Sequence, residues 1–385
     1  MVHRDCTALA SARQDARPGR TQRRVLAILL ACLAWATAGF GPPILTSGGT
    51  PPAWRLDPAQ VQALVAAARL PTITAQAALL ADAAAGRVLL ASHAEDPLPP
   101  ASTTKIMTAL LVLERADPDA LVTVPAEALI GEASMGLTPG ERLTVRDLLY
   151  GLLLVSGNDA AMTLASYVAG SPDAFVALMN QRAAELGLTA SRFANPHGLD
   201  APDHVMSAAD LLTVTRAALT YDLFATIVAT PQARVAGHFL VNRNELLTTY
   251  PGADGVKTGT TDAAGECLVA SASRDGRRAI AIVLGSRDRY ADSRALLDHY
   301  LEHYTLFDPA LPRNALSRRR WPDGRVRELV AVAASTIVLP RWQQPLARPV
   351  LRLEGDGAPG TPAGKLTFYV GPRAVAEAPL RWQEP

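Results

Sequence analysis

The chain has 385 residues, a formal net charge of +1, 49% apolar residues and 5% aromatic residues. This near-neutral balance gives no electrostatic support for binding to nucleic acid, and the length is sufficient for two or three domains with a large core. Three of the 37 basic residues are lysines, Lys105, Lys257 and Lys365. Lysine, unlike arginine, can lose its proton in a buried site. Lys105 and Lys257 lie in short catalytic-type motifs and are therefore candidates for catalysis.

Residues 1–45 have the pattern of an export signal. Six arginines and two aspartates occur in residues 1–24, and an uncharged run extends from Val25 to Leu45. This asymmetry predicts a cytoplasmic tail followed by an exported protein, in the periplasm or on the outer face of the cytoplasmic membrane. Ala36-Thr37-Ala38 is a plausible cleavage site, and an uncleaved anchor is the alternative, since about 20 apolar residues can span a bilayer. Residues 46–72 are expected to be a linker with a short helix.

A hairpin and a helix are expected next. Residues 76–82 and 87–92 read as two strands joined by a turn. Three prolines within residues 97–100 then keep the chain extended as far as Ser102-Thr103-Thr104-Lys105. Apolar residues recur after this motif at helical spacing, until Asp117-Pro118 ends the helix.

Helices dominate the middle of the chain. Thr144 and Asp147 form a capping-box pattern before an apolar helix at 145–155. Ser156-Gly157-Asn158 interrupts the helical pattern, which resumes at 160–168 and again at 172–186. A tight loop at 195–199 precedes a further helix that begins after Ser207.

The last third combines a hairpin, a helix and a small β domain. Lys257-Thr258-Gly259 precedes expected strands at 266–273 and 278–284, and an amphipathic helix is expected at 292–304. From about residue 314, short runs rich in Val and Leu alternate with Gly/Pro turns, as in 326–333 and 335–339, which predicts a β domain over 314–385. No apolar helix follows, so membrane attachment is expected only through the N-terminal segment.

Three short motifs carry the chemistry. A turn of helix would place Ser102 and Lys105 on the same face. Serine is a poor nucleophile until a neighbouring base takes its proton, and a neutral lysine can do so when burial and a second cation lower its pKa. Lys257 is the candidate for that cation. The sequence S-x-x-K, then S-x-N, then K-T-G occurs in serine enzymes that react with penicillin.

On these motifs the chain resembles the low-molecular-mass penicillin-binding proteins, specifically the serine D-Ala-D-Ala carboxypeptidases, from about Gln76 to Leu380. Short sequence segments outside the three motifs also support the resemblance, including Pro139-Gly140-Glu141 and Asn195-Pro-His-Gly-Leu199. It implies a β-lactamase/transpeptidase-like α+β fold over residues 73–308, with an antiparallel sheet flanked by helices and a helical subdomain. It also implies the small C-terminal all-β domain.

The resemblance implies a role for each motif. Ser102 would attack the carbonyl between two D-alanines and become acylated, Lys105 would be the general base, and Ser156 would relay a proton to the leaving D-alanine. Ser102 and Thr260 would supply the backbone N–H groups of an oxyanion hole. The residues that would bind substrate lie in the motifs or near them: Asn158, Lys257, Thr258, Gly259, Thr260 and Arg289, with Arg287 and Arg294 as rivals for Arg289.

The implied partners are a peptidoglycan stem peptide ending in D-Ala-D-Ala and β-lactams as covalent inhibitors, with no cofactor and no metal. A D,D-endopeptidase of peptidoglycan cross-links uses the same motifs and is the main alternative. A β-lactamase would need a loop glutamate, and no convincing motif for one occurs between Asn158 and Lys257. A penicillin sensor would need a signalling domain. The H-x-x-E-H spacing at His299–His303 is expected to be helix surface rather than a metal site.

Overall fold

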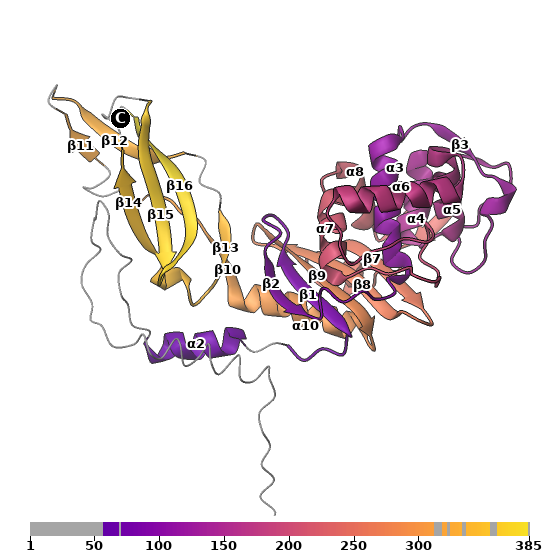
Figure 1. Cartoon of the computed structure of the whole chain (residues 1–385), viewed down its shortest axis with the longest axis horizontal. Coiled ribbons are helices and arrows are strands. Elements are labelled where there is room, and N and C mark those ends of the chain that lie inside the picture. Colours follow the sequence, from indigo (N-terminus) through magenta and orange to yellow (C-terminus); the bar gives the residue numbers. More distant parts are fainter. Residues whose placement is uncertain are drawn as a thin grey trace, which may run out of the picture. The chain divides into compact units, whose positions relative to one another are not determined.

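A five-stranded antiparallel sheet lies at the centre of the larger part of the chain, in the computed structural model of residues 57–68, 71–311, 318–321, 324–332, 336–354 and 360–383 (Figure 1). Its strands, in spatial order, are β2 (Val88–Ser92), β1 (Ala77–Asp82), β9 (Arg277–Ser286), β8 (Gly265–Arg274) and β7 (Ala253–Thr261). The predicted hairpins are therefore present, and β1 pairs with β9 to join them. The predicted signal segment, residues 1–45, lies outside the described residues.

The chain divides into two compact units. The larger unit comprises Val65–Asp308 and Ser335–Pro345, and the smaller unit holds the other described residues. The only described helix before β1 is α2 (Pro58–Ala68).

Both faces of the central sheet are buried, which explains why its strands are apolar along most of their length. Successive residues of a strand point to opposite faces. In β1, Leu79 belongs to the core shared with most of the helices, whereas Leu80 belongs to a second core with α10 (Arg289–His303). Tyr300 of α10 is completely buried in that second core.

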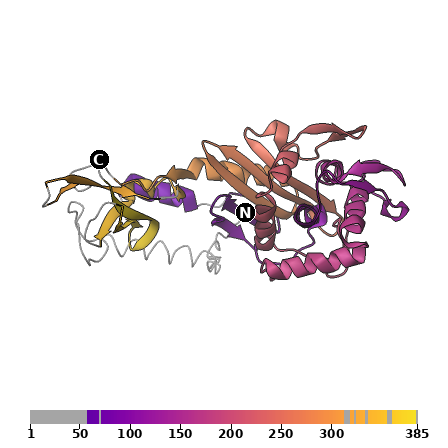
Figure 2. The same cartoon turned by 90° about the horizontal axis from the view of Figure 1, so that it is seen from above.

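On the other face, α7 (Ala208–Ala218) and α8 (Asp222–Val228) pack against the strands. With them, four more helices form the helical subdomain: α3 (Lys105–Arg115), α4 (Val145–Leu154), α5 (Asn158–Ala169) and α6 (Pro172–Glu185). Figure 2 shows these helices, coloured from purple to rose, gathered beside the sheet. A one-turn 3-10 helix, η1 (Ala101–Thr104), leads directly into α3. The first two turns of α3 are entirely buried, so this helix forms the centre of the subdomain.

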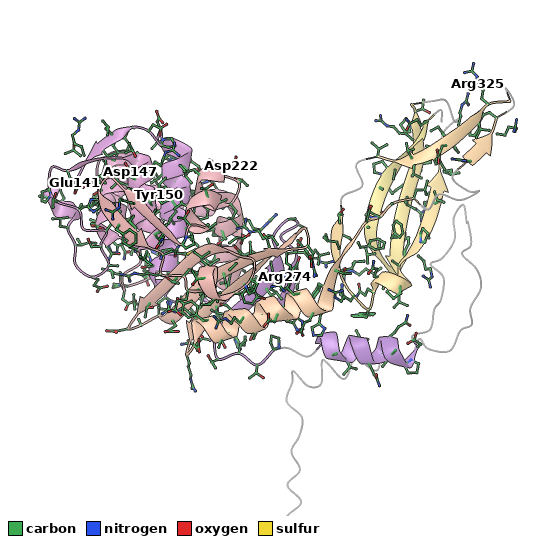
Figure 3. All side chains as sticks on the ribbon, turned by 180° about the vertical axis from the view of Figure 1, so that it is seen from behind. Glu141, Asp147, Tyr150, Asp222, Arg274 and Arg325 are labelled. Carbon is green, nitrogen blue, oxygen red and sulfur yellow. The ribbon has the colours of Figure 1, made fainter. Side chains whose placement is uncertain are left out.

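The predicted capping box at the start of α4 is present. Thr144 Oγ1 accepts a hydrogen bond from the Asp147 backbone N–H at 3.1 Å, and the Asp147 carboxylate accepts from the Thr144 N–H at 3.2 Å. Figure 3 labels Asp147 and Tyr150 on this helix. Asp288 caps α10 in a similar way by accepting from Tyr290 and Ala291, so α10 begins three residues before the predicted start.

Short elements complete the larger unit and were not anticipated from the sequence. They are the two-stranded sheets β3 (Leu121–Thr123) with β4 (Arg142–Thr144) and β5 (Gln232–Val235) with β6 (His238–Val241), and the single turns η2 (Ala126–Ala128) and α9 (Leu246–Thr249). Strands of three or four residues are too short to show a clear period in the sequence.

One expected domain assignment needs correction. The run at 335–339 was expected in the C-terminal β domain, but β13 (Ile337–Pro340) pairs with β10 (Tyr304–Phe307) inside the larger unit. The physical reason is burial. Val338 and Leu339 are 5% and 0% exposed, and Val338 packs in the second core beside Tyr304.

The smaller unit contains a five-stranded antiparallel sheet. Its spatial order is β11 (Arg318–Arg320), β12 (Val326–Ala331), β16 (Arg373–Gln383), β15 (Pro362–Val370) and β14 (Arg348–Leu353), and the turn η3 (Gln344–Leu346) precedes β14. Buried and exposed residues alternate along most of β16, as expected for a strand with one covered face. Lys365 is exposed there and pairs with Glu377 at 2.8 Å.

Within the described residues, no single helix is both long and apolar enough to cross a bilayer. Helices α7 and α8, which are joined by a sharp bend, reach the required length and apolar composition only when they are taken together.

Candidate active site

The S-x-x-K motif lies at the junction of η1 and α3. Ser102 is in the 3-10 turn, and Lys105 is the first residue of α3 and completely buried. Lys105 Nζ lies 3.0 Å from Ser102 Oγ, within hydrogen-bonding distance. The two groups therefore have the separation that proton transfer requires.

The surroundings of Lys105 favour its neutral form. Nζ donates hydrogen bonds to Asn158 Oδ1 at 2.8 Å and to the His197 carbonyl at 2.5 Å. Burial holds the pKa of Lys105 well below its usual value, and the positive charge of Lys257 lowers it further. A neutral amine that donates both hydrogens to these acceptors keeps its lone pair for the Ser102 hydroxyl, so Lys105 has the properties of a general base.

The S-x-N motif is the break between α4 and α5. Ser156 has a left-handed backbone conformation, with φ of 65°, and its side chain is 3% exposed. Within the described residues, the buried Ser156 Oγ has no hydrogen-bond partner. An unpaired buried hydroxyl beside a nucleophile is available to a substrate or a transferred proton. Asn158, the first residue of α5, holds Lys105 in place.

The K-T-G motif lies on β7, at the edge of the sheet. A Cβ atom on Gly259 would lie 2.9 Å from the Ser102 backbone nitrogen and 2.9 Å from Ala101 Cβ. Only glycine therefore lets β7 come this close to η1. The backbone of β7 at Gly259 lies directly against the backbone of η1 at Ser102.

Lys257 is buried and is not one of the residues that line the pocket. It is 1% exposed, and its Nζ donates to the Thr258 carbonyl at 2.7 Å. Burial lowers the pKa of Lys257 to about 7, and the charges of Arg243 and Arg289 contribute. This position suits the expected role of a second cation near Lys105 better than direct contact with a substrate carboxylate.

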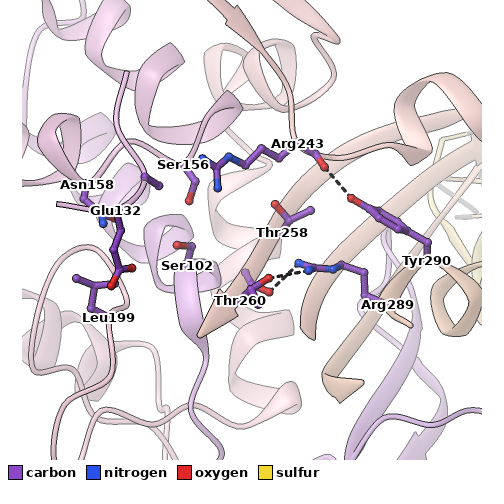
Figure 4. Close-up of a pocket in the computed structure, with 12 residues that line it drawn as sticks. Ser102, Glu132, Ser156, Asn158, Leu199, Arg243, Thr258, Thr260, Arg289 and Tyr290 are labelled. Atoms are coloured by element: carbon purple, nitrogen blue, oxygen red, sulfur yellow. Dashed lines mark hydrogen bonds between the residues drawn. The ribbon is translucent and has the colours of Figure 1, made fainter. Parts of the chain in front are cut away.

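One pocket joins the three motifs (Figure 4). Of the predicted site residues, seven line it: Ser102, Ser156, Asn158, Thr258, Gly259, Thr260 and Arg289. The other five lining residues were not predicted as site residues: Glu132, Ala133, Leu199, Arg243 and Tyr290. Leu199 lies in the segment 195–199, which supported the family resemblance. Arg243 and Glu132 lie in no motif, so the sequence does not distinguish them from surface charges; only the tertiary fold brings them to the pocket.

Arg289 braces the end of β7. Its guanidinium donates to the Gly259 carbonyl at 2.8 Å and to Thr260 Oγ1 at 2.6 Å, and it pairs with Glu266 at 3.1 Å. Neither rival lines the pocket. Arg294 instead donates to Thr249, on α9.

A buried histidine positions the nucleophile turn. His204 is 3% exposed; its Nδ1 accepts from the Ala194 N–H at 2.8 Å, and its Nε2 lies 2.8 Å from Thr104 Oγ1. Thr104 Oγ1 donates to the Ala101 carbonyl, so it accepts from His204 Nε2–H. Burial lowers the pKa of His204 to about 4, which keeps the ring neutral in this arrangement.

The other histidine and cysteine side chains considered in this unit lie outside the reacting groups. The Leu199 N–H donates to His197 Nδ1 at 3.2 Å, as in a loop-stabilising contact. Cys267 is buried, and burial raises its pKa to about 11. Among the described residues, no group of three His, Cys, Asp or Glu side chains could hold a metal ion. The expectation of helix surface at His299–His303 is wrong for His299, which is 6% exposed, and its ring lies tilted at 54° to that of His303.

Comparison with known proteins gives a consistent result. The family model Peptidase_S11, described as D-alanyl-D-alanine carboxypeptidase, matches residues 64–288. The chain is 34% identical over 337 residues to the D-alanyl-D-alanine carboxypeptidase DacC of Escherichia coli, covering 80% of this chain and 84% of that protein. It is 38% identical over 244 residues to the D-alanyl-D-alanine carboxypeptidase DacF of Bacillus subtilis, covering 60% of this chain but 63% of that relative's length.

Solved structures show the same similarity. Penicillin-binding protein 6B from Escherichia coli superposes with a TM-score of 0.67 at 32% identity, covering 81% of this chain and 96% of that one. The match therefore extends beyond the region of the three motifs.

Proposed function

Because the chain belongs to the D-alanyl-D-alanine carboxypeptidase family, we propose that it removes the terminal D-alanine from peptidoglycan stem peptides through an acyl-enzyme on Ser102. The observation that carries this proposal is the buried Lys105, whose Nζ lies 3.0 Å from Ser102 Oγ and whose pKa is lowered by burial and by Lys257.

In the acylation step, Ser102 Oγ attacks the carbonyl between the two D-alanines as its proton passes to Lys105 Nζ. The backbone N–H groups of Ser102 and Thr260 would stabilise the oxyanion. The unpaired Ser156 hydroxyl then relays this proton from Lys105 to the nitrogen of the leaving D-alanine as the C–N bond breaks, which returns Lys105 to its neutral form. Water then attacks the ester carbonyl as its proton passes to Lys105, and the Ser102–acyl bond breaks as Lys105 returns that proton to Ser102 Oγ.

The substrate's terminal carboxylate would lie at the cationic end of the pocket. Arg243 and Arg289 line it there, beside the hydroxyl groups of Thr258 and Thr260. Figure 4 shows both arginines on the side of Ser102 that faces β7. A carboxylate next to two guanidinium groups favours a peptide with a free C-terminus, which is the requirement of a carboxypeptidase.

The test compares two substrates: a soluble pentapeptide ending in D-Ala-D-Ala and a cross-linked peptide dimer. A carboxypeptidase releases D-alanine from the first faster than it cleaves the second. Faster cleavage of the dimer would favour the endopeptidase alternative.

No glutamate between Asn158 and Lys257 lines the pocket within the described residues, so we expect slow hydrolysis of the penicilloyl-enzyme.

We further propose that the protein is exported and stays at the outer face of the membrane or in the periplasm. The arginine-rich residues 1–24 and the uncharged run that follows support this proposal. Fusion of residues 1–72 to a reporter enzyme that is active only outside the cytoplasm should give activity. Replacing the arginines of residues 1–24 by glutamate should abolish it, and equal activity from both fusions would contradict the proposal.

A further inference from the structure

Glu132 is the acidic residue among the described residues that line the pocket, where the other charged side chains are Arg243 and Arg289. Its carboxylate has no hydrogen-bond or ion-pair partner in the described part of the chain. Its backbone has φ of 71°, a left-handed conformation that is unfavourable for a residue with a side chain. An unpaired charge on a strained residue at a reaction pocket suggests a function.

The active-site motif itself fixes the backbone on both sides of Glu132. Asn158 Nδ2 donates to the Gly131 carbonyl at 3.2 Å, and the Asn158 N–H donates to the Ala133 carbonyl at 2.7 Å. The next residues are held by Asp159, whose carboxylate is 1% exposed and accepts from the N–H groups of Met135 to Leu137 at 3.1 to 3.2 Å. Glu132 is therefore held at a fixed place relative to the S-x-N motif.

The pocket is polarised about the nucleophile. Figure 4 shows Glu132 with Asn158 and Leu199 on one side of Ser102, and Arg243 and Arg289 on the other. If the arginines hold the terminal carboxylate, the residues that precede the scissile bond extend toward Glu132. A carboxylate at that end attracts a cation on this part of the peptide.

We propose that Glu132 selects stem peptides in which the residue before D-Ala-D-Ala carries a free side-chain ammonium group. This inference rests on the proposed carboxypeptidase function and deepens it by naming a feature of the substrate. Glu132 is a specificity residue in this account, since Ser102 and Lys105 perform the chemistry without it.

The test uses two peptides that differ in one charge, Nα-acetyl-L-Lys-D-Ala-D-Ala and Nα,Nε-diacetyl-L-Lys-D-Ala-D-Ala. The readout is the ratio of their kcat/KM values for D-alanine release. An ion pair at an exposed site predicts a ratio of about threefold to fivefold in favour of the free amine. The ratio should fall as salt screens the pair, approach one in Glu132→Gln, and invert in Glu132→Lys.

Using the ratio removes effects that act on both peptides alike, including the influence of the Glu132 charge on Lys105. Glu127→Gln is the matched control, because Glu127 is an exposed residue of the same connection that does not line the pocket. It should retain the wild-type ratio.

A wild-type ratio of one or below would overturn the inference, as would an unchanged ratio in Glu132→Gln. In both cases release of D-alanine from the diacetylated peptide would leave the proposed function standing. Release from neither peptide would reject the proposed function, and this inference with it.

Discussion

At the scale of single residues, the account depends on a lysine that is neutral when folded. Lys105 has three polar contacts, to Ser102, Asn158 and His197, and a neutral amine satisfies all three only if it accepts from Ser102. The same buried position that makes the charged form unfavourable therefore orients the lone pair at the nucleophile.

Replacing Lys105 by arginine tests this arrangement. Arginine keeps the positive charge but cannot lose its proton, so Lys105→Arg should slow acylation of Ser102 by penicillin by about 10²-fold or more. Stopped-flow or gel-based labelling with a fluorescent penicillin gives the rate. A Lys105→Arg protein that acylates at the wild-type rate would show that Lys105 is not the base.

The pKa of Lys257 predicts how the activity of the enzyme falls at basic pH. This pKa is lowered to about 7, so Lys257 is charged below that pH and neutral above it. Lys257 does not line the pocket, so its charge acts on the substrate carboxylate at a distance, and loss of this charge weakens the attraction. We therefore expect kcat/KM, which reports ionisation of the free enzyme, to fall as the pH rises through 7. Lys257→Arg stays charged, so its profile should lack this fall even if its overall rate is lower. The same fall in both proteins would refute the assignment.

At the scale of elements, the site is assembled where loops and secondary structures end. The sequence predicted the helices around S-x-x-K and S-x-N, because caps and periodic apolar residues mark them. It placed no strand on K-T-G, which the structure shows to lie within β7. It did not predict Glu132 or Arg243. Each lies in a connection with no periodic pattern, and only the pairing of β7 with β8 and the packing of the helical subdomain bring them near Ser102.

The hydrogen bond between His204, in the loop before α7, and Thr104, in η1, predicts that the stability of the fold depends on pH. His204 has a folded pKa of about 4, below its ordinary value of 6.5, so the unfolded chain binds a proton that the folded chain excludes. The stabilising contribution is complete above pH 6.5 and is lost as the pH falls toward 4. Between pH 7 and pH 5 this residue should account for about 2 kcal/mol of lost unfolding free energy.

Urea denaturation of wild type and His204→Gln at both pH values measures this contribution. Gln does not titrate, so the difference in unfolding free energy between pH 7 and pH 5 should be smaller in the variant. His197, whose pKa is lowered to about 3 by burial, is present in both proteins and cancels in the comparison. Equal differences in the two proteins would show that His204 is not held neutral.

At the scale of the whole molecule, the pocket belongs to one unit. All of its lining residues fall between Ser102 and Tyr290, within the larger unit. The sequence correctly predicted a β-rich C-terminal region, but it could not show that β13 returns to pair with β10, because a short apolar strand carries no mark of its partner.

A chain that ends at Asp308 tests the independence of the site. It keeps every pocket residue and should still be acylated by penicillin. It also loses β13, whose Leu339 is completely buried, so its melting temperature should fall. Leu339→Ala in the full-length chain is the matched control and should cost about 2–5 kcal/mol of stability without loss of acylation. A truncated chain that is folded but not acylated would contradict the assignment of the site to the larger unit.

The most direct test of the central claim is release of free D-alanine from a peptide ending in D-Ala-D-Ala, measured for the wild-type protein and for Ser102→Ala. The account predicts release by the wild type, no release above background by Ser102→Ala, and labelling of Ser102 alone by penicillin. Release by Ser102→Ala at the wild-type rate, or no release by a wild-type protein that penicillin still labels at Ser102, would contradict it.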